Sequence, residues 1–369
     1  MPADAATMTC PRCRAKLRIP ADKGLAHSRC PRCRLPLDHE SQGGGGERWR
    51  RPRQLGPYRL GGRLGVGSMG RVYRTTLDGQ DVAIKILARQ AAEDAELFHR
   101  FEREARLGLA LKHPNLVRVH RQECHDGHHC LVMDLVDGPS LEQVVDREGV
   151  LPWRRAVGYM IQVAEAVDHL HRRGIIHRDL KPENIHLDGH DRPRLLDLGF
   201  SKELAPSDGD RLPSDLTISG TSLGSPAYMS PEQVGDAANA TAACDIYGIA
   251  STLFHMVTGV LPFDGRSAVE VMERVLREPV PRIRQHDPDL PAALDELLAW
   301  AMVKEPQLRP ENAGALARML EYVGEHPDDA GTVRRERRQR RQLPLRAMAM
   351  YLIVLVCFSA ACLWLVLMD

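Results

Sequence analysis

The sequence predicts an α+β fold, and two features of its first half indicate it. A glycine-rich stretch over residues 64–72 runs into alternating β-branched residues, an Asp78-Gly79 turn and a second strand over 82–86, which together indicate an antiparallel hairpin. The next stretch, residues 92–111, is predicted to be a helix because apolar side chains recur every four positions, at Leu97, Phe101, Ala105 and Leu109.

The glycine-rich stretch has the spacing G-x-G-x-x-G-x-V, which occurs in two kinds of nucleotide site. A dinucleotide-binding turn needs a helix straight after the glycines and an acidic residue about 20 residues later. The stretch here continues as a strand instead, so it predicts a flap whose backbone N–H groups close over phosphates where side chains are missing. Its residues are Leu64, Gly65, Val66, Gly67, Ser68, Met69, Gly70, Arg71 and Val72.

The most specific stretch is H-R-D-L-K-P-E-N over residues 177–184, followed by Asp197-Leu198-Gly199. Asp179 can accept the proton of an attacking hydroxyl, and Lys181 offers a positive charge to a moving phosphate. Asn184 and Asp197 offer hard oxygen ligands to Mg²⁺. The stretch therefore predicts phosphoryl transfer.

These blocks, in this order, resemble the protein kinase family, in particular its bacterial serine/threonine members, over about Tyr58 to Val323. The resemblance implies a bilobal protein kinase fold, with a small antiparallel β lobe that carries the αC helix and a large, mainly α-helical lobe. It also implies transfer of the γ-phosphate of ATP, with Mg²⁺ or Mn²⁺, to Ser or Thr hydroxyls of protein substrates. Lys181 favours this specificity over tyrosine.

The resemblance assigns roles to further residues. Lys85 is implied to hold the α- and β-phosphates and to pair with Glu104, with Glu102 as the competing partner, while Asp179 orients and deprotonates the hydroxyl. The other implied ATP contacts are Ala83, the gatekeeper Met133, the backbone from Asp134 to Val136, and His186, which can stack on adenine in place of the usual apolar side chain.

The polar segment between Asp197 and Pro231 fits a disordered surface loop on composition alone, and the resemblance makes it an activation segment. Arg178 is the type of residue that binds a phosphorylated hydroxyl in such a segment. The expected phosphorylation sites are Thr217 and Ser219.

Further resemblances concern the large lobe and the spine behind the site. Ser225 is expected to contact Asp179 and Lys181, residues 245–248 to buttress the catalytic loop, and Arg309 to pair with Glu232. Two departures, Leu198 for the usual Phe and Gly108 for a larger apolar residue, predict a loosely packed spine.

The first 40 residues predict a zinc ribbon, because two C-P-R-C-R knuckles match the spacing of a four-thiolate site. Disulfides are the alternative, but a domain that consumes ATP belongs in a reducing cytosol. Arginines surround the knuckles, yet no aromatic residue precedes Trp49, so we expect a protein partner here rather than nucleic acid. The zinc ligands are Cys10, Cys13, Cys30 and Cys33.

Residues 347–368 are uncharged and, at about 1.5 Å per residue, long enough to span a bilayer core of about 30 Å. A buried terminal helix is the alternative. Seven arginines precede the stretch in the basic juxtamembrane segment 324–346, whereas only Asp369 follows it, so the kinase domain and the N-terminus are expected in the cytoplasm. The predicted protein is therefore a single-pass, tail-anchored membrane protein without a signal peptide. Residues 41–57 are expected to form a flexible Gly/Arg-rich linker that leads to the kinase domain, residues 58–323.

Two other functions stay open at this point: a pseudokinase scaffold, and a nucleic-acid-binding regulator that uses the zinc ribbon. Intact Lys85, Asp179, Asn184 and Asp197 argue against the first. A homodimer is expected if neighbouring chains phosphorylate each other.

Overall fold

The computed structural model describes residues 6–9, 16–19, 53–66, 70–196, 202–203, 225–236 and 240–342. The chain divides into two units, residues 1–53 and 54–369. Several predictions lie outside the described residues: the four zinc-ligand cysteines, Gly67 to Met69, Asp197, Thr217, Ser219 and the apolar stretch 347–368.

In the first unit, one antiparallel hairpin is described. It pairs β1 (Ala6–Thr9) with β2 (Lys16–Ile19). The first C-P-R-C knuckle lies in the chain between these two strands.

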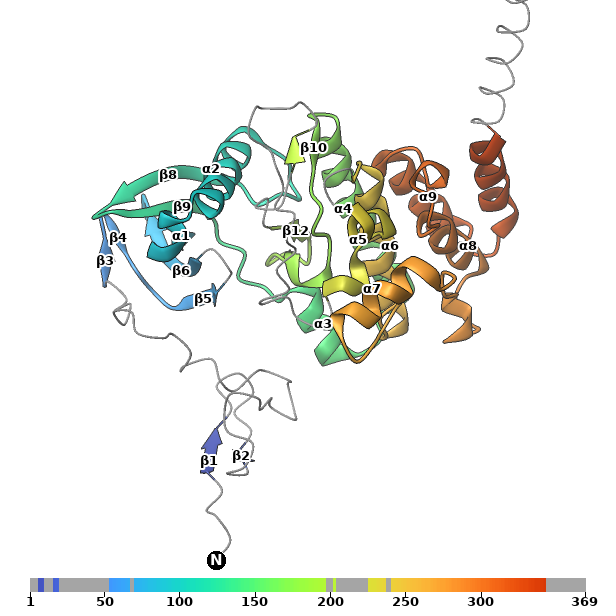
Figure 1. The fold of residues 1–369 in the computed structure, drawn as a ribbon, viewed down its shortest axis with the longest axis horizontal. Helices are drawn as coiled ribbons and strands as arrows, with labels where there is room; N and C mark the ends of the chain where they lie inside the picture. The colour runs from blue at the N-terminus through green and yellow to red at the C-terminus, as the bar shows by residue number, and fades with distance from the viewer. Residues whose placement is uncertain are drawn as a thin grey trace, which may run out of the picture. The chain divides into compact units, whose positions relative to one another are not determined.

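The small lobe of the second unit is a five-stranded antiparallel sheet with the order β5-β6-β7-β9-β8 (Figure 1). The predicted turn is confirmed, because β6 and β7 are joined by Asp78 and Gly79 with φ values of 52° and 82°, as a two-residue hairpin requires. The strands are β5 (Arg63–Val66), β6 (Gly70–Leu77), β7 (Gln80–Leu87), β8 (Val119–His125) and β9 (His128–Asp134), preceded by the short hairpin of β3 (Gln54–Leu55) and β4 (Tyr58–Arg59).

The single helix predicted over 92–111 is two helices, α1 (Arg89–Glu93) and α2 (Ala95–Ala110). The break falls at Asp94, which has an extended backbone and whose carboxylate accepts a hydrogen bond from the Leu97 N–H at 3.1 Å, as an N-cap does. Phe101 and Ala105 are buried as predicted, but the assignment of Leu109 to the same face was wrong, since it is 41% exposed. A repeat of four residues drifts around a helix by about 40° per step, so the apolar stripe passes to other positions by the last turn.

The large lobe is built around α6 (Ala243–Thr258), which is buried along almost its whole length. The helices α4 (Trp153–His171), α8 (Ala292–Ala301) and α9 (Ala313–Glu325) pack on it (Figure 1). The other helices of the lobe are α3 (Leu141–Glu148), α5 (Pro231–Asp236) and α7 (Ala268–Arg277).

Short strands and turns between these helices shape the loops of the large lobe. The strand pairs are β10 (Ile175–Ile176) with β13 (Lys202–Glu203), and β11 (Ile185–Leu187) with β12 (Pro193–Leu195). The 3₁₀ turns are η2 (Pro182–Asn184), η3 (Ser225–Tyr228), η5 (Ile283–Gln285) and η6 (Pro306–Leu308).

The chain beyond α9 stays helical over residues 330–342. Val333 of this helix is fully buried in the core of the large lobe. Within the part of the chain that the structure describes, no helix is both long enough and apolar enough to cross a membrane.

Candidate active site

Lys85 lies on β7 and forms a buried ion pair with Glu104 of α2. The Lys85 Nζ is 2.8 Å from Glu104 Oε1 and 2.7 Å from Oε2. Glu102, the competing candidate, is exposed on the same helix with His99 as a neighbour. Because both oxygens of one carboxylate bond the ammonium group, the positive charge is held in one place with little access to water.

The Asp179 carboxylate lies in the loop between β10 and β11, and both Lys181 and Asn184 contact it. Asp179 Oδ1 is 2.9 Å from Lys181 Nζ, and Asn184 Nδ2 donates to Asp179 Oδ2 at 2.8 Å and to the Asp179 carbonyl oxygen at 2.8 Å. The carboxylate is therefore oriented from both sides. Since the amide nitrogen of Asn184 is used in this way, its Oδ1 is the atom suited to a hard cation.

The loop is held in place by Asp245 at the start of α6. Its carboxylate accepts hydrogen bonds from the backbone N–H groups of His177 and Arg178, both at 2.8 Å, and lies 2.7 Å from His171 Nε2. Burial alone would raise the pKa of Asp245, but these bonds outweigh it and hold that pKa below its usual value. A charged carboxylate thus supports Arg178, whose φ of 70° is unusual for a side chain with a Cβ.

His177 connects this loop to the segment that leads to Asp197. The Asp179 N–H donates to His177 Nδ1 at 3.3 Å, so His177 Nε2 carries the proton that faces the Leu196 carbonyl oxygen, also at 3.3 Å. The Leu196 N–H in turn donates to the Asn184 carbonyl oxygen at 2.9 Å. The residue before the predicted ligand Asp197 is therefore bonded to the other predicted ligand.

The predicted adenine contacts lie on adjacent strands and on the segment after β9. Ala83 and Met133 are paired in the sheet, and Ala83 is buried. Burial lowers the pKa of His186, and the neutral ring places Nδ1 3.3 Å from the Gly138 carbonyl oxygen. The His186 ring is thus tied to the backbone at Gly138. Val136, two residues before Gly138, is half-buried.

Two glycines near the site are required by close packing. An added Cβ on Gly70 would overlap the Ile86 carbonyl oxygen of the neighbouring strand. At Gly108 it would overlap the side chain of Val119 on β8. The prediction of a loosely packed spine at Gly108 was therefore wrong, because Val119 fills the space that a larger residue would occupy.

Arg309 pairs with Glu232, as predicted, and joins the end of the activation segment to the large lobe. Its guanidinium binds both Glu232 oxygens, at 2.5 and 2.8 Å, and is fully buried. On the other side of α5, the Gln233 amide donates to the Arg178 carbonyl oxygen at 2.8 Å. The side chain of Ser225 lies outside the described residues, so its predicted contacts stay predictions.

Three features described above belong together: the buried Lys85–Glu104 pair, the oriented Asp179 carboxylate, and Glu232 held by Arg309. Residues 58–320 match the family model described as the protein kinase domain. The chain belongs to the protein kinase family.

Curated and solved kinases resemble this chain over the same region. It is 35% identical over 276 residues to the serine/threonine-protein kinase PknH of Mycobacterium bovis, covering 74% of this chain and 45% of that protein. It is 34% identical over 260 residues to the serine/threonine-protein kinase PrkC of Bacillus subtilis, covering 70% and 39%. A crystal structure of a mutant PknI kinase domain from Mycobacterium tuberculosis superposes with a TM-score of 0.55 at 29% identity, covering 73% of this chain and 96% of that one. The chain spans less than half the length of these two curated relatives.

Some contacts of this kinase could not be found from the sequence. The Asp134 carboxylate at the hinge lies 2.7 Å from Arg194 Nη2 on β12 and 2.8 Å from His120 Nε2 on β8. It thereby ties the hinge to both lobes. No local pattern marks these three residues, because Arg194 is sixty positions away from Asp134.

Glu183, inside the catalytic loop, also escaped the sequence interpretation. Burial, reinforced by the nearby Glu142 carboxylate, raises the pKa of Glu183 to about 7. Its Oε2 has no hydrogen-bond partner within the described residues. A glutamate on a surface loop would ordinarily be fully ionised at neutral pH, so only the tertiary environment reveals this one.

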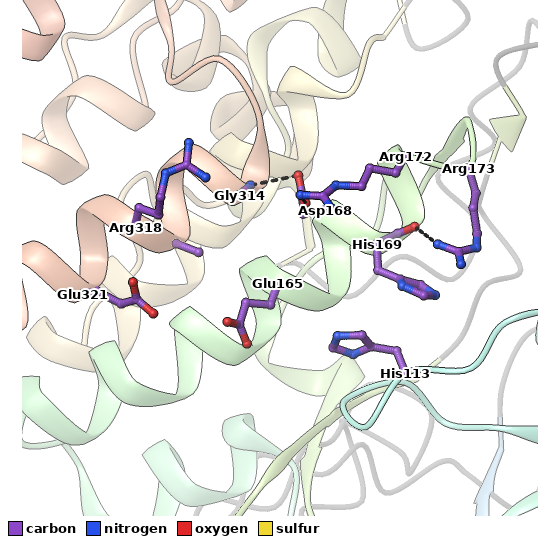
Figure 2. A pocket seen from close by; sticks show the side chains of 10 residues that line it. His113, Glu165, Asp168, His169, Arg172, Arg173, Gly314, Arg318 and Glu321 are labelled. Atoms are coloured by element: carbon purple, nitrogen blue, oxygen red, sulfur yellow. Dashed lines mark hydrogen bonds and ion pairs between the residues drawn. The ribbon is translucent and has the colours of Figure 1, made fainter.

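A cavity of about 620 Å³ lies between α4 and α9 of the kinase, away from the candidate active site, and none of the predicted site residues line it. Figure 2 shows the rings of His113 and His169 facing each other at one end, with Arg318 and Glu321 at the other. Burial, the neighbouring imidazole and Arg173 lower the pKa of His113, and burial followed by the nearby arginines lowers that of His169. Both rings are therefore neutral at physiological pH, and the mixed charges of the lining favour no single ligand class.

Proposed function

We propose that this protein is a serine/threonine protein kinase that transfers the γ-phosphate of ATP to Ser or Thr hydroxyls of proteins. The observation that carries the proposal is the Asp179 carboxylate, oriented by Lys181 and Asn184. The buried Lys85–Glu104 pair supports it, because both groups are already in contact. The names of the relatives, serine/threonine-protein kinases, support the same substrate class.

In this mechanism Asp179 orients the substrate hydroxyl and accepts its proton as the oxygen attacks the γ-phosphorus, while the bond from that phosphorus to the bridging oxygen breaks and ADP leaves. Lys181 stabilises the negative charge on the transferring phosphoryl group, and Lys85 positions the α- and β-phosphates. Asn184, through Oδ1, and Asp197 are the residues that would hold Mg²⁺ or Mn²⁺, which neutralises phosphate charge when bound. Most of the catalysis is thus positioning and electrostatics by groups whose partners are already in place.

Labelled-phosphate incorporation tests this function directly. Full-length protein incubated with [γ-³²P]ATP and Mg²⁺ should label itself on serine and threonine, with Thr217 and Ser219 as the favoured sites. Arg178 supports these sites, since its Nε has no partner within the described residues and a phosphate adds about −1.5 to −2 charges that can bind it. A protein that binds ATP but incorporates no phosphate into itself or into generic basic protein substrates would indicate the pseudokinase instead.

We further propose that residues 347–368 anchor the kinase in a membrane, with the catalytic domain and the N-terminus in the cytoplasm. The uncharged length and the arginines before it support this orientation. The full-length protein should remain in the pellet after carbonate washing, because a spanning helix resists extraction. Deletion of 347–369 should move the protein to the supernatant, and extraction of the full-length chain would contradict the anchor.

We propose a structural Zn²⁺ on Cys10, Cys13, Cys30 and Cys33, in a module that binds a protein partner rather than nucleic acid. The β1–β2 hairpin supports the site, because its connection contains the first cysteine pair. One zinc per chain is expected by metal analysis, with lower occupancy in Cys10→Ser and in Cys33→Ser. Cys124→Ser, which alters an exposed cysteine of the small lobe, is the matched control. Zinc-free protein after gentle purification would refute the ribbon.

A further inference from the structure

The helix over residues 330–342 packs against the large lobe as part of its fold. Ala330 and Val333 on one side are buried. One turn further along, Arg337 is half-buried. Two turns along, Arg340 Nε donates to the Arg309 carbonyl oxygen at 3.3 Å. These positions share one face of a helix. The same face therefore packs on the lobe along its length.

The start of this helix is also held by side chains. The Asp329 carboxylate accepts hydrogen bonds from the Thr332 N–H at 3.1 Å and from the Thr332 hydroxyl at 2.7 Å, as an N-cap does. The Tyr322 hydroxyl of α9 donates to the same carboxylate at 2.5 Å. These bonds lower the pKa of Asp329, so the cap is charged and fixes where the helix leaves α9.

Next to this packed face, the helix surface carries an arginine stripe, which we define as Arg334, Arg335, Arg338 and Arg341. Arg334 is 3.0 Å from Glu296, and Arg335 donates to the Thr332 hydroxyl at 2.9 Å. Arg338 and Arg341 are exposed and pair with no acidic group within residues 240–342 or elsewhere in the described chain. Like charges at this spacing oppose helix formation, so an anionic partner would stabilise the stripe.

The position of the stripe in the chain identifies that partner. Only residues 342–346 separate Arg341 from the uncharged stretch 347–368. Basic residues beside a membrane span attract anionic lipid headgroups, and the planar guanidinium matches the geometry of a phosphate. We propose that the arginine stripe binds anionic phospholipid headgroups and, because the adjacent face of its helix is packed on the large lobe, holds the kinase in one orientation on the membrane surface. The proposal rests on the membrane anchor proposed above.

Arginine footprinting of the full-length protein tests the contact. The protein is reconstituted into phosphatidylcholine vesicles with or without phosphatidylglycerol, and the rate of phenylglyoxal modification is followed at each arginine by mass spectrometry. Arg335, Arg338 and Arg341 should react roughly five-fold more slowly with the anionic lipid, the change expected from about 1 kcal/mol per basic residue near such a surface. The protection should vanish in about 1 M KCl, where the Debye length is about 3 Å. Arg266, which is 97% exposed on its side chain, is the internal control and should react equally in both vesicles.

Three outcomes would overturn the proposal. Equal rates in both vesicles would show that no lipid contact forms. Equal protection in both would show that protein covers the stripe, for example a second copy of this chain. Protection by added RNA in neutral vesicles, without protection by phosphatidylglycerol, would make the partner a nucleic acid.

Hydrogen–deuterium exchange extends the test to variants. Exchange over residues 330–342 should be slower in anionic than in neutral vesicles for the wild type, and this lipid dependence should disappear in R335Q/R338Q/R341Q. The control variant R147Q/R266Q/R277Q removes three exposed arginines elsewhere and should retain it. If R335Q/R338Q/R341Q kept the lipid dependence, that result would also refute the contact. Carbonate resistance of the same samples reports the anchor separately, so loss of the anchor and loss of the stripe contact are distinguishable.

Discussion

Asp179→Asn should lower phosphoryl transfer by about 10²–10⁴-fold while ATP still binds. The substitution removes the proton acceptor and leaves the Lys85–Glu104 pair in place. It also places an amide between two donors, the Lys181 ammonium and the Asn184 amide, where the wild type has an acceptor-only carboxylate. The variant therefore loses both the orientation of the substrate hydroxyl and the base that accepts its proton, and both losses slow phosphoryl transfer.

The measurement separates chemistry from binding. Initial rates of labelled-phosphate incorporation give the loss of turnover, and titration with a fluorescent ATP analogue gives the affinity. Asp126→Asn is the matched control, because Asp126 occupies the β8–β9 turn at a positive φ of 51°, a conformation that asparagine tolerates, and lies outside the site. Autophosphorylation of the Asp179 variant at the wild-type rate would disprove the assignment of Asp179 as the base.

Arg309→Met should lower the free energy of unfolding by about 3–5 kcal/mol, as expected when one partner of a buried ion pair is removed. Arg309 is 0% exposed, and all five of its N–H groups have acceptors. Two are the Glu232 oxygens, and the other three are the backbone carbonyl oxygens of Val303, Ala243 and Lys304. Methionine would fill much of the volume but would leave the Glu232 charge unpaired and would remove a hydrogen bond from each of the three carbonyl groups.

Urea unfolding of the variant checks this value. In the double variant with Glu232→Gln, part of the loss should return, because the unpaired charge is gone. Arg274→Met on α7 is the control, since its pair with Glu270 is on the surface and should contribute far less to the free energy of unfolding. A loss for Arg309→Met no larger than for Arg274→Met would mean that the buried pair does not hold the segment end.

The sequence was sufficient to predict the catalytic chemistry and much of the small lobe. Asp179, Lys181 and Asn184 lie in one contiguous loop, and residue types at fixed spacing carry that information without any knowledge of the fold. The Asp78-Gly79 turn was equally predictable, since a two-residue hairpin with positive φ values strongly selects for this dipeptide. The pairing of Lys85 with Glu104 rather than Glu102 was implied by the resemblance together with the helical register, and the structure places Glu104 there.

Other features were decided only when distant segments packed together. His171 and Asp245 are 74 positions apart, yet their contact supports the catalytic loop. The exposure of Leu109 depends on which side of α2 meets the sheet, and the fit at Gly108 depends on Val119 of another element. The arginine-rich stretch after α9 suggested only a charged segment, because nothing in its composition shows that Ala330 and Val333 will be buried. Local spacing determines which chemical groups are available, whereas burial and long-range hydrogen bonds determine which of them are oriented, neutralised or left exposed.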